Sequence, residues 1–360
     1  MKNTLFITLL TATMLSCSDN IQKKLPAGIV KEVQNRIDTG YHLNTVIGII
    51  DKNGTRFYNY GQMSLTDSLK PNENSIFEIG SVAKIFTTAL LADLELNKEI
   101  EISNSINQYM PVFEQVLKNN NRTITLEDLI NHTSGLPRNP TNVNRDDSNR
   151  YSDYSKADLI EFLSSYTVDS STKKYLYSNL AYLVLENAIE NKTGKSYESL
   201  MHEKIWGTLG MNDSYFTVPD AKRDRLVTPY RSGEHVEELD MGEFPAGGGI
   251  KTTAKEMIRF IAAQLGIHST TLDPALKLTH EERFSNDEEK LGLAWAILKR
   301  EDSGRTIHYH KGGTNGFVSF AGFNLEDQIG VVVLASGHRW YSDLGFKILD
   351  PTYPLTITEE

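Results

Sequence analysis

The chain has 360 residues, of which 39% are hydrophobic and 23% charged, as is ordinary for a globular protein. This length holds one large domain or two intertwined ones. The formal net charge of −10 disfavours nucleic acid as a partner, and the sequence has no basic patch for anionic lipid. No apolar run after residue 20 is long enough to span a bilayer.

The N-terminus has the pattern of a targeting segment, so residues 1–17 are left out of the expected fold. Lys2 is followed by an apolar run over residues 5–15, and the run ends at Ser16-Cys17. Cys17 is the only cysteine, which excludes an internal disulfide. A small residue followed by cysteine resembles a bacterial lipoprotein box and implies that Cys17 is lipidated; ordinary signal cleavage nearby is the alternative. In either case we expect export, and with the lipid a protein anchored to a bacterial membrane, facing the periplasm or the cell exterior.

The remaining chain is expected to be strand-rich at both ends and helix-rich in the middle. A polar linker and an amphipathic helix occupy residues 18–40, and a hairpin follows, turning at Asn53-Gly54. Helices dominate from Ser81 to about Arg225. The last third is expected to contain strands over residues 291–298, 306–310, 316–323 and 329–335, a glycine-rich turn over 312–316, and a helix over 342–349.

This arrangement predicts an α+β fold in which one antiparallel sheet is built from both ends of the chain. We expect the sheet domain to comprise residues 41–84 and 226–360. A mostly helical domain is expected over residues 85–225, with the active site between the two domains.

Ser81 and Lys84 form the first candidate catalytic pair. Ser81 follows Gly80 at the start of an apolar run, and residues three apart on a helix share one face, so Lys84 would lie beside Ser81. A serine hydroxyl needs such a base. The start of a helix also offers free N–H groups to a developing oxyanion. The alternative is that Ser81 only caps the helix and Lys84 is solvated.

Tyr177-Ser178-Asn179 is the second candidate element and precedes a helix that begins near Leu180. A phenol beside an ammonium group has a lowered pKa, so Tyr177 could carry protons for Ser81. Asn179 offers an amide donor and acceptor for a substrate amide. A buried tyrosine at the start of a helix is the simpler interpretation.

The third candidate element is His310-Lys311-Gly312-Gly313 at the end of an expected strand. The two glycines would let a substrate approach the backbone closely. The N–H of Gly313 could join that of Ser81 in an oxyanion hole. A glycine-rich hairpin turn without catalytic function is the alternative.

Together these elements resemble the penicillin-recognising serine hydrolases, specifically the class C β-lactamases and the related DD-peptidases and esterases, from about Thr45 to Leu349. Phe77 to Lys84 matches the class C form of the Ser-x-x-Lys element. The resemblance implies a β-lactamase/transpeptidase-like fold. An ungapped match places His310 where these enzymes usually have lysine, whereas a one-residue gap would place Lys311 there.

The resemblance further implies acyl transfer through a covalent intermediate on Ser81, with Lys84 as base and Tyr177 as proton carrier. Asn179, with His310 or Lys311 and Gly312, would bind the substrate, and the Ser81 and Gly313 N–H groups would bind the oxyanion. The substrate would be a small-molecule β-lactam, a D-Ala-D-Ala peptide or an ester. Neither a cofactor nor a metal is implied, and the protein would act as a monomer.

The sequence disfavours two functions from other classes. A metallohydrolase is disfavoured because the nine histidines are scattered and a single cysteine cannot build a thiolate site. A non-catalytic cell-wall-binding relative is disfavoured because Ser81, Lys84 and Tyr177 are all present.

Overall fold

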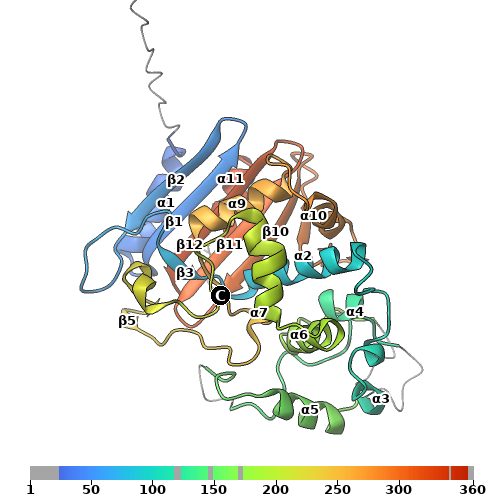
Figure 1. Ribbon diagram of the computed structural model, residues 1–360. Helices are drawn as coiled ribbons and strands as arrows, with labels where there is room; N and C mark the ends of the chain where they lie inside the picture. Colours follow the sequence, from blue (N-terminus) through green and yellow to red (C-terminus); the bar gives the residue numbers. More distant parts are fainter. Residues whose placement is uncertain (1–23, 117–122, 145–148, 169–172, 340–341, 356–360) are drawn as a thin grey trace, which may run out of the picture.

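The computed structural model describes residues 24–116, 123–144, 149–168, 173–339 and 342–355, so Cys17 lies outside the described part. Its framework is one antiparallel sheet with the order β2-β1-β12-β11-β10-β9-β8-β7 (Figure 1). The strands are β1 (His42–Asp51), β2 (Gly54–Gly61), β3 (Ile76–Glu78), β4 (Tyr230–Arg231), β5 (Glu234–His235), β6 (Lys251–Thr253), β7 (Phe284–Ser285), β8 (Lys290–Leu291), β9 (Ala296–Lys299), β10 (Thr306–Gly313), β11 (Phe317–Asn324) and β12 (Ile329–Gly337).

Helices cover both faces of this sheet and form the region below it in Figure 1, where α3, α4, α5 and α6 lie. The α-helices are α1 (Ala27–Asp38), α2 (Ala83–Leu96), α3 (Phe113–Val116), α4 (Leu126–Ile130), α5 (Lys156–Ser165), α6 (Leu180–Thr193), α7 (Tyr197–Leu200), α8 (Gly207–Leu209), α9 (Ala254–Gln264), α10 (Asp273–His280) and α11 (Ser342–Leu349). Short 3₁₀ turns cover Gly80–Val82, Ile106–Gln108, Asp220–Arg225 and Pro245–Gly247, and a π-helical turn covers Met201–Trp206.

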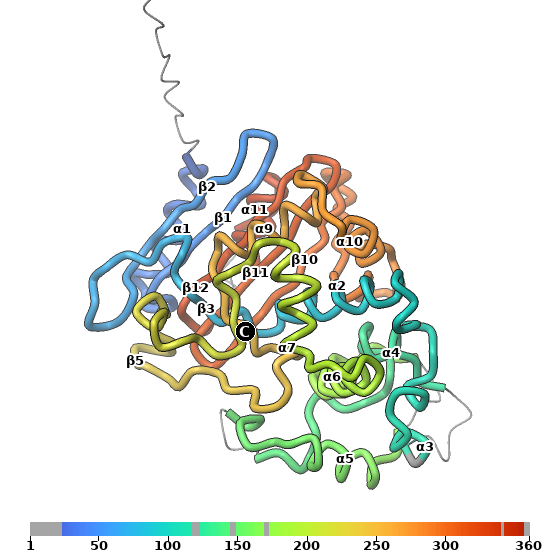
Figure 2. Tube along the Cα trace, viewed as in Figure 1, coloured from blue at the N-terminus to red at the C-terminus, as the bar shows by residue number. Residues whose placement is uncertain are grey.

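The two ends of the chain meet within the sheet, where β1 and β12 are the second and third strands in the order. Strand β1 pairs with β12 from Thr45 opposite Ala335 to Ile50 opposite Gly330. Figure 2 shows the blue N-terminal strands beside the red C-terminal ones. This pairing confirms the prediction that the sheet is built from both termini.

Alternation of side chains along the strands gives the sheet two apolar faces. In β12, Val331 and Val333 face a core shared with α1 and α11, whereas Val332 and Leu334 face the larger core that contains α2 and α9. Burying one such side chain contributes about 1.5–3 kcal/mol. The sheet is therefore covered on both sides, and the larger core holds α2 in place beneath the cleft described below.

Helix α2 is apolar nearly all round, and every residue from Ala83 to Ala92 is buried. It packs against α10 and against the turn at Pro245–Gly247. A helix buried on all sides requires such a sequence. Lys84 differs from the other residues of this run because its fully buried side chain ends in an ionisable amine.

The structure corrects two expected elements in the last third. The strand expected over residues 291–298 is split into β8 and β9 by a tight turn, in which the Gly292 N–H donates to the Trp295 carbonyl at 2.8 Å and Ala294 has φ +64°. The expected turn over 312–316 is shorter than predicted. Gly312 and Gly313 continue β10, and the reversal is closed by the Thr314 N–H donating to the Phe317 carbonyl at 2.9 Å.

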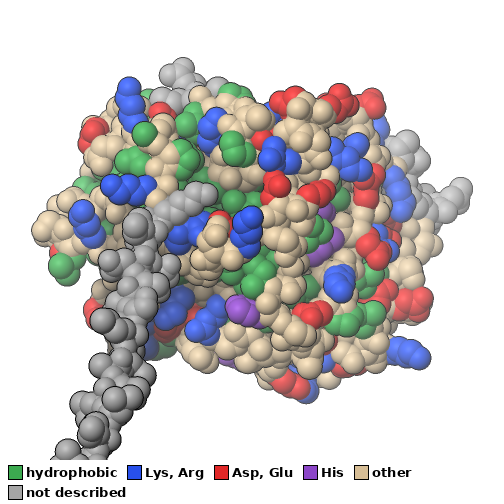
Figure 3. All heavy atoms as spheres, turned by 90° about the horizontal axis from the view of Figure 1, so that it is seen from above, with side chains coloured by type: hydrophobic (Ala, Val, Ile, Leu, Met, Phe, Trp, Pro, Cys, Tyr) green, Lys and Arg blue, Asp and Glu red, His purple; other side chains and the backbone are tan. Residues whose placement is uncertain are grey.

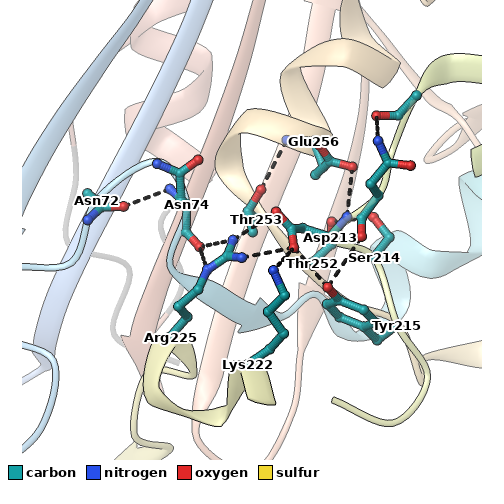
Figure 4. A network of polar contacts seen from close by, with 12 residues as sticks. Asn72, Asn74, Asp213, Ser214, Tyr215, Lys222, Arg225, Thr252, Thr253 and Glu256 are labelled. Atoms are coloured by element: carbon teal, nitrogen blue, oxygen red, sulfur yellow. Dashed lines mark hydrogen bonds and ion pairs between the residues drawn. The ribbon is translucent and has the colours of Figure 1, made fainter. Parts of the chain in front are cut away.

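An ion-pair cluster, here called the Asp213 clamp, consists of Asp213, Tyr215, Arg225 and the Asn74 carbonyl (Figure 4). The Arg225 guanidinium donates to both Asp213 carboxylate oxygens, at 2.8 and 3.0 Å, and to the Asn74 carbonyl at 2.6 Å. The Tyr215 hydroxyl donates to Asp213 at 2.8 Å. The clamp therefore ties the chain before β3 to the 213–225 segment.

Charged side chains of both signs are interspersed on the face seen in Figure 3. Within the described ranges, no helix has the length and apolar character needed to cross a membrane.

Candidate active site

Ser81 lies in the 3₁₀ turn that joins β3 to α2. Gly80 has φ +48°, a conformation that side chains other than glycine rarely adopt. A Cβ placed on Gly80 would lie 2.9 Å from the Gly313 nitrogen and 2.7 Å from its carbonyl oxygen. The sharp turn and the missing side chain therefore allow β10 to approach the start of α2, with Ser81 at the contact.

Lys84 lies one helical turn after Ser81, as the spacing predicts. Its Nζ is 3.2 Å from Ser81 Oγ, 3.2 Å from Asn179 Oδ1 and 2.5 Å from the Gly247 carbonyl oxygen. The side chain is fully buried, and no carboxylate of the described residues forms an ion pair with it. The alternative of a solvated lysine is therefore wrong.

Burial lowers the pKa of Lys84 below 10.5, against an opposing interaction with the Tyr177 hydroxyl, and the Arg138 charge lowers it further. The physical cause is that a cation loses hydration in this site without gaining a counter-ion. A neutral amine has two donors and one lone pair. These match the two carbonyl-type oxygens of Asn179 and Gly247 and the hydroxyl of Ser81, which can donate to the lone pair.

The N–H of Gly313 faces the same turn. In the β10–β11 pair, Gly313 lies opposite Val318, and the next pair, Thr314 and Phe317, is joined by a backbone hydrogen bond. Antiparallel pairs alternate between hydrogen-bonded and non-hydrogen-bonded, so the Gly313 N–H points away from β11. Strand β9 pairs with β10 only up to Tyr309. The Gly313 N–H is therefore directed toward Gly80 and Ser81, as an oxyanion donor requires.

Gly312 has a different purpose from the one expected. A Cβ on Gly312 would lie 2.0 Å from the Ile79 carbonyl oxygen, 2.4 Å from Ser319 Oγ and 3.0 Å from the Val82 nitrogen. What approaches this glycine closely is the protein's own backbone, not a substrate. Gly312 therefore permits the contact between β10 and the Ile79–Val82 turn.

Tyr177 is half-buried and is packed between charged and aromatic groups. Lys84 Nζ lies 5.3 Å from the centroid of its ring, and the Arg138 guanidinium carbon lies 5.2 Å away. The ring of His132 packs against it at 4.3 Å between centroids, tilted by 39°. The tyrosine is thereby held beside Lys84.

His132 is buried, has φ +58°, and its Nδ1 accepts the Ser178 N–H at 3.1 Å. Burial lowers its pKa well below 6.5, and the nearby Lys84 charge contributes. A neutral ring whose Nδ1 accepts carries its proton on Nε2. None of the three predicted motifs includes His132, yet this residue fixes both the ring and the backbone around Tyr177.

Asn179 precedes α6 and is only partly available to a substrate. Its Oδ1 faces Lys84, and its Nδ2 donates to Asn139 Oδ1 at 3.2 Å, which leaves one amide hydrogen. Its backbone N–H donates to the Arg138 carbonyl at 2.8 Å. These bonds connect the loop at 138–139 to the start of α6.

His310 lies near Lys84, whereas Lys311 is exposed. The His310 Nδ1–H donates to the Lys311 carbonyl at 2.8 Å. Burial, together with repulsion by Lys84, lowers the pKa of His310 to about 3. The neutral form is favoured because the ring is desolvated beside a basic amine and gains no acidic partner.

Two adjoining cavities, of about 480 and 280 Å³, share Ser81, Arg138, Gly313 and Thr314 in their walls. The larger of the two is also lined by His132, Tyr175, Tyr177, Glu289, Tyr309, His310 and Lys311. The smaller one is also lined by Asn139, Arg150, Tyr151 and Asn179. The predicted residues of all three motifs therefore meet around one cleft.

A separate cavity of about 570 Å³ is lined by several carboxylates, among them Glu186, Glu190 and Glu243. The described part of the chain contains no group of three His, Cys, Asp or Glu residues placed to hold a metal ion. This cavity has neither Ser81 nor Lys84 in its wall, so the candidate site is the Ser81 cleft.

The model of the β-lactamase family matches residues 30–347 of this chain. The D-alanyl-D-alanine-carboxypeptidase/endopeptidase AmpH of Escherichia coli K12 is 26% identical over 309 residues, covering 80% of this chain and 78% of its own. A β-lactamase of the same organism is 25% identical over 326 residues, covering 81% of this chain and 83% of its own.

Solved structures show the same fold. A class C β-lactamase from Rhodobacter sphaeroides superposes with a TM-score of 0.77 at 21% identity, covering 89% of this chain and 96% of its own. A β-lactamase/D-alanine carboxypeptidase from Pseudomonas syringae gives a TM-score of 0.76 at 22% identity, covering 91% of this chain and 98% of its own. The antiparallel sheet and its helices thus have the architecture that the sequence predicts.

Proposed function

Because this chain belongs to the β-lactamase family, we propose that it is a serine acyl hydrolase that opens β-lactams, which are cyclic amides, through a covalent acyl-Ser81 intermediate. One observation carries the proposal. Ser81 Oγ lies 3.2 Å from the amine of Lys84, whose pKa is lowered by burial, and no carboxylate of the described chain compensates its charge. A serine beside a neutral amine is an activated nucleophile.

In acylation, the Ser81 oxygen attacks the substrate carbonyl carbon while its proton passes to Lys84. The tetrahedral intermediate then loses its C–N bond, and the Tyr177 hydroxyl gives its proton to the leaving nitrogen. Lys84 returns its proton to Tyr177. Positioned acid–base groups of this kind accelerate such steps about 10²- to 10⁴-fold.

The N–H groups of Ser81 and Gly313 are the proposed oxyanion donors. Ser81 begins the first turn before α2, where backbone N–H groups have no partner within the helix, and Gly313 presents its N–H from β10. Loss of one such donor costs roughly 3 kcal/mol in the transition state. In deacylation, Tyr177 passes its hydroxyl proton to neutral Lys84 as it takes a proton from water, and the water oxygen attacks the ester carbon. The Ser81–acyl C–O bond then breaks as protonated Lys84 gives its proton to the Ser81 oxygen.

DD-carboxypeptidase or endopeptidase activity on peptidoglycan peptides is the second candidate. It is favoured by His310, which stands where the ungapped comparison with class C enzymes has lysine, and by the likeness to AmpH. Both activities use the same acyl-serine chemistry, and they differ in the leaving group. Hydrolysis of small esters requires the same groups.

We further propose that the chain is exported as a monomeric lipoprotein with lipid on Cys17, facing the periplasm or the cell exterior. The support is the sequence pattern around Ser16-Cys17. Wild-type protein is expected to fractionate with membranes and Cys17→Ser in the soluble fraction. A Cys17→Ser protein that remains in the membrane fraction would contradict the lipid anchor.

Steady-state kinetics on nitrocefin, an acyl-D-Ala-D-Ala peptide and a p-nitrophenyl ester, measured side by side, test the function. We expect kcat/KM to be highest for nitrocefin. A higher kcat/KM for the peptide than for nitrocefin would instead assign the protein as a DD-peptidase. A protein that turns over none of the three substrates, yet binds cell walls, would be a non-catalytic relative.

A further inference from the structure

The group that binds the substrate carboxylate is not settled by the third motif. β-Lactams and peptides ending in D-Ala-D-Ala both carry a carboxylate one carbon from the scissile amide nitrogen. A histidine can bind such an anion only through an N–H donor or a positive charge. Whether His310 has either is decided by its hydrogen bond.

Near neutral pH, His310 presents neither an N–H donor nor a positive charge to the cleft. The Lys311 carbonyl can only accept, so the proton of the neutral ring lies on Nδ1 and is committed to that 2.8 Å bond. Nε2 then carries a lone pair, which repels a carboxylate. The low pKa of His310, which results from burial and from Lys84, keeps the ring uncharged.

Lys311 is also poorly suited. It follows His310 in β10, is exposed, and lines the same larger cavity. Its charge acts on Glu289, whose pKa burial raises and Lys311 opposes. Both residues line the larger cavity, so a substrate anion there would meet the Glu289 carboxyl group as well as the Lys311 ammonium.

Arg138 is placed differently. Its side chain is exposed at the cleft, it lines both cavities together with Ser81, and its guanidinium carbon lies 5.2 Å from the Tyr177 ring centroid. Among the residues that the structure describes, it pairs with no carboxylate. A planar guanidinium has donors in a fork that matches a carboxylate.

The backbone of Arg138 is fixed relative to the catalytic groups. Its carbonyl accepts the N–H groups of Asn179 and Leu180, at 2.8 and 3.2 Å. The carbonyl of the preceding Pro137 accepts the Ser178 hydroxyl at 2.7 Å. The residue is thus tied to the Tyr177–Asn179 element, although its side chain reaches the solvent.

We propose that Arg138 binds the carboxylate next to the scissile amide of the substrate and thereby selects anionic substrates over neutral ones. This inference rests on the proposed acyl-Ser81 chemistry. It assigns to a residue of the loop between α4 and α5 the recognition that the resemblance assigns to the third motif.

The test compares substrates that differ only in this charge. Wild type, Arg138→Gln, Arg138→Lys and Arg150→Gln are assayed on benzylpenicillin and its methyl ester, and on an acyl-D-Ala-D-Ala peptide and its C-terminal amide. Arg138→Gln is expected to lower kcat/KM about 30-fold for the carboxylates, mainly through KM, because a hydrogen bond to a charged group is lost. The ester and the amide should change less than about 3-fold, and Arg138→Lys should recover part of the loss as a point charge.

Arg150 is the matched control, since it is a second guanidinium and lines the smaller cavity only. Its replacement should cost less than about 5-fold, the effect of general attraction at a partly screened site. The same loss for Arg150→Gln as for Arg138→Gln would overturn the inference. An equal loss on charged and neutral substrates would also overturn it, and would assign Arg138 a structural role beside Tyr177.

Two further measurements keep the outcomes distinct. A neutral fluorophosphonate should label Ser81 in the wild type and in Arg138→Gln alike; absence of labelling in the wild type would contradict the proposed function itself. If Arg138→Gln does not fold, the wild type alone can test the carboxylate contact. Added salt should then lower kcat/KM for the substrates that carry the carboxylate, and not for the ester or the amide. Equal salt dependence would reject the carboxylate contact.

Discussion

In the Asp213 clamp a guanidinium and a carboxylate meet and both stay charged, whereas in the Ser81 cleft a basic group is buried without an acid. The Arg225 hydrogen bonds lower the pKa of Asp213 to about 2, and those of Asp213 raise the pKa of Arg225. Burial instead lowers the pKa values of Lys84 and His310. The first arrangement stabilises charge and supports the fold, while the second suppresses charge and prepares a base.

This difference between the two clusters predicts that a permanent positive charge at Lys84 has the largest effect on catalytic activity. Arginine keeps the positive charge but cannot become a neutral base. Lys84→Arg should therefore reduce kcat/KM roughly 10³-fold, within the range of general-base losses. In the wild type, kcat/KM should rise as the pH rises through the lowered pKa of Lys84, because only the neutral amine accepts the Ser81 proton. Activity of Lys84→Arg near that of the wild type would contradict Lys84 as base.

The next effect concerns the contact that brings Gly313 to Ser81. Gly312→Ala would place a Cβ 2.0 Å from the Ile79 carbonyl oxygen, so β10 must move away from the turn. We expect a loss in kcat of about 10²-fold, as for a lost oxyanion donor. Gly28→Ala in α1, where no atom lies within 4 Å of the new Cβ, is the control and should retain activity. Normal kcat for Gly312→Ala would show that this close approach is not required.

Replacing the basic residue of the Asp213 clamp should lower the stability of the fold and leave catalytic activity nearly unchanged. Arg225→Gln removes the guanidinium that binds both Asp213 oxygens and leaves only the longer ion pair with Lys222, at 3.6 Å. It should lower the free energy of unfolding by about 1–3 kcal/mol at pH 7, measured by urea denaturation. The folded pKa of Asp213, about 2, lies below its usual 3.8. The stability it contributes is therefore present above pH 4 and is lost as the pH falls toward 2. That acid-dependent loss should shrink in Arg225→Gln, while kcat/KM at pH 7 changes less than about 3-fold. A large loss of kcat would reject the separation of the two clusters.

The smallest expected effect is that His310 contributes no ionisation to the pH profile of kcat/KM. Burial lowers the pKa of His310 to about 3, so His310 stays neutral from pH 5 to 8. The pH profile of kcat/KM should therefore have no falling limb near pH 6–7 that His310→Gln removes. Such a limb, present in the wild type and absent in the variant, would mean that His310 is charged in the working enzyme.

The local parts of the site could be predicted from the sequence. The three-residue spacing places Lys84 beside Ser81, and the apolar run of α2 requires burial of whatever lies within it. The alternating β-branched strands likewise indicate the sheet. That strands from both ends of the chain form one antiparallel sheet could also be predicted, although not that β1 and β12 are neighbours.

The long-range parts could not be predicted. Gly80 and Gly313 are brought together by packing of segments far apart in the chain, and only the structure gives the direction of the Gly313 N–H. His132 and Arg138 belong to a loop whose sequence carries no sign that it contacts Tyr177. The state of His310 depends on a hydrogen bond to its neighbour's carbonyl and on burial beside Lys84, and neither is encoded in a motif.

The most direct test of the account is the identity of the acylated atom. Wild-type protein mixed with benzylpenicillin and quenched in acid within the first turnovers should gain the mass of one penicillin, and digestion should locate it on Ser81. Ser81→Ala should gain no mass and lose turnover, yet melt normally, since a serine at the start of a helix contributes at most about 1 kcal/mol as a cap. Turnover that persists in Ser81→Ala, or an acyl group located on another residue, would contradict the account.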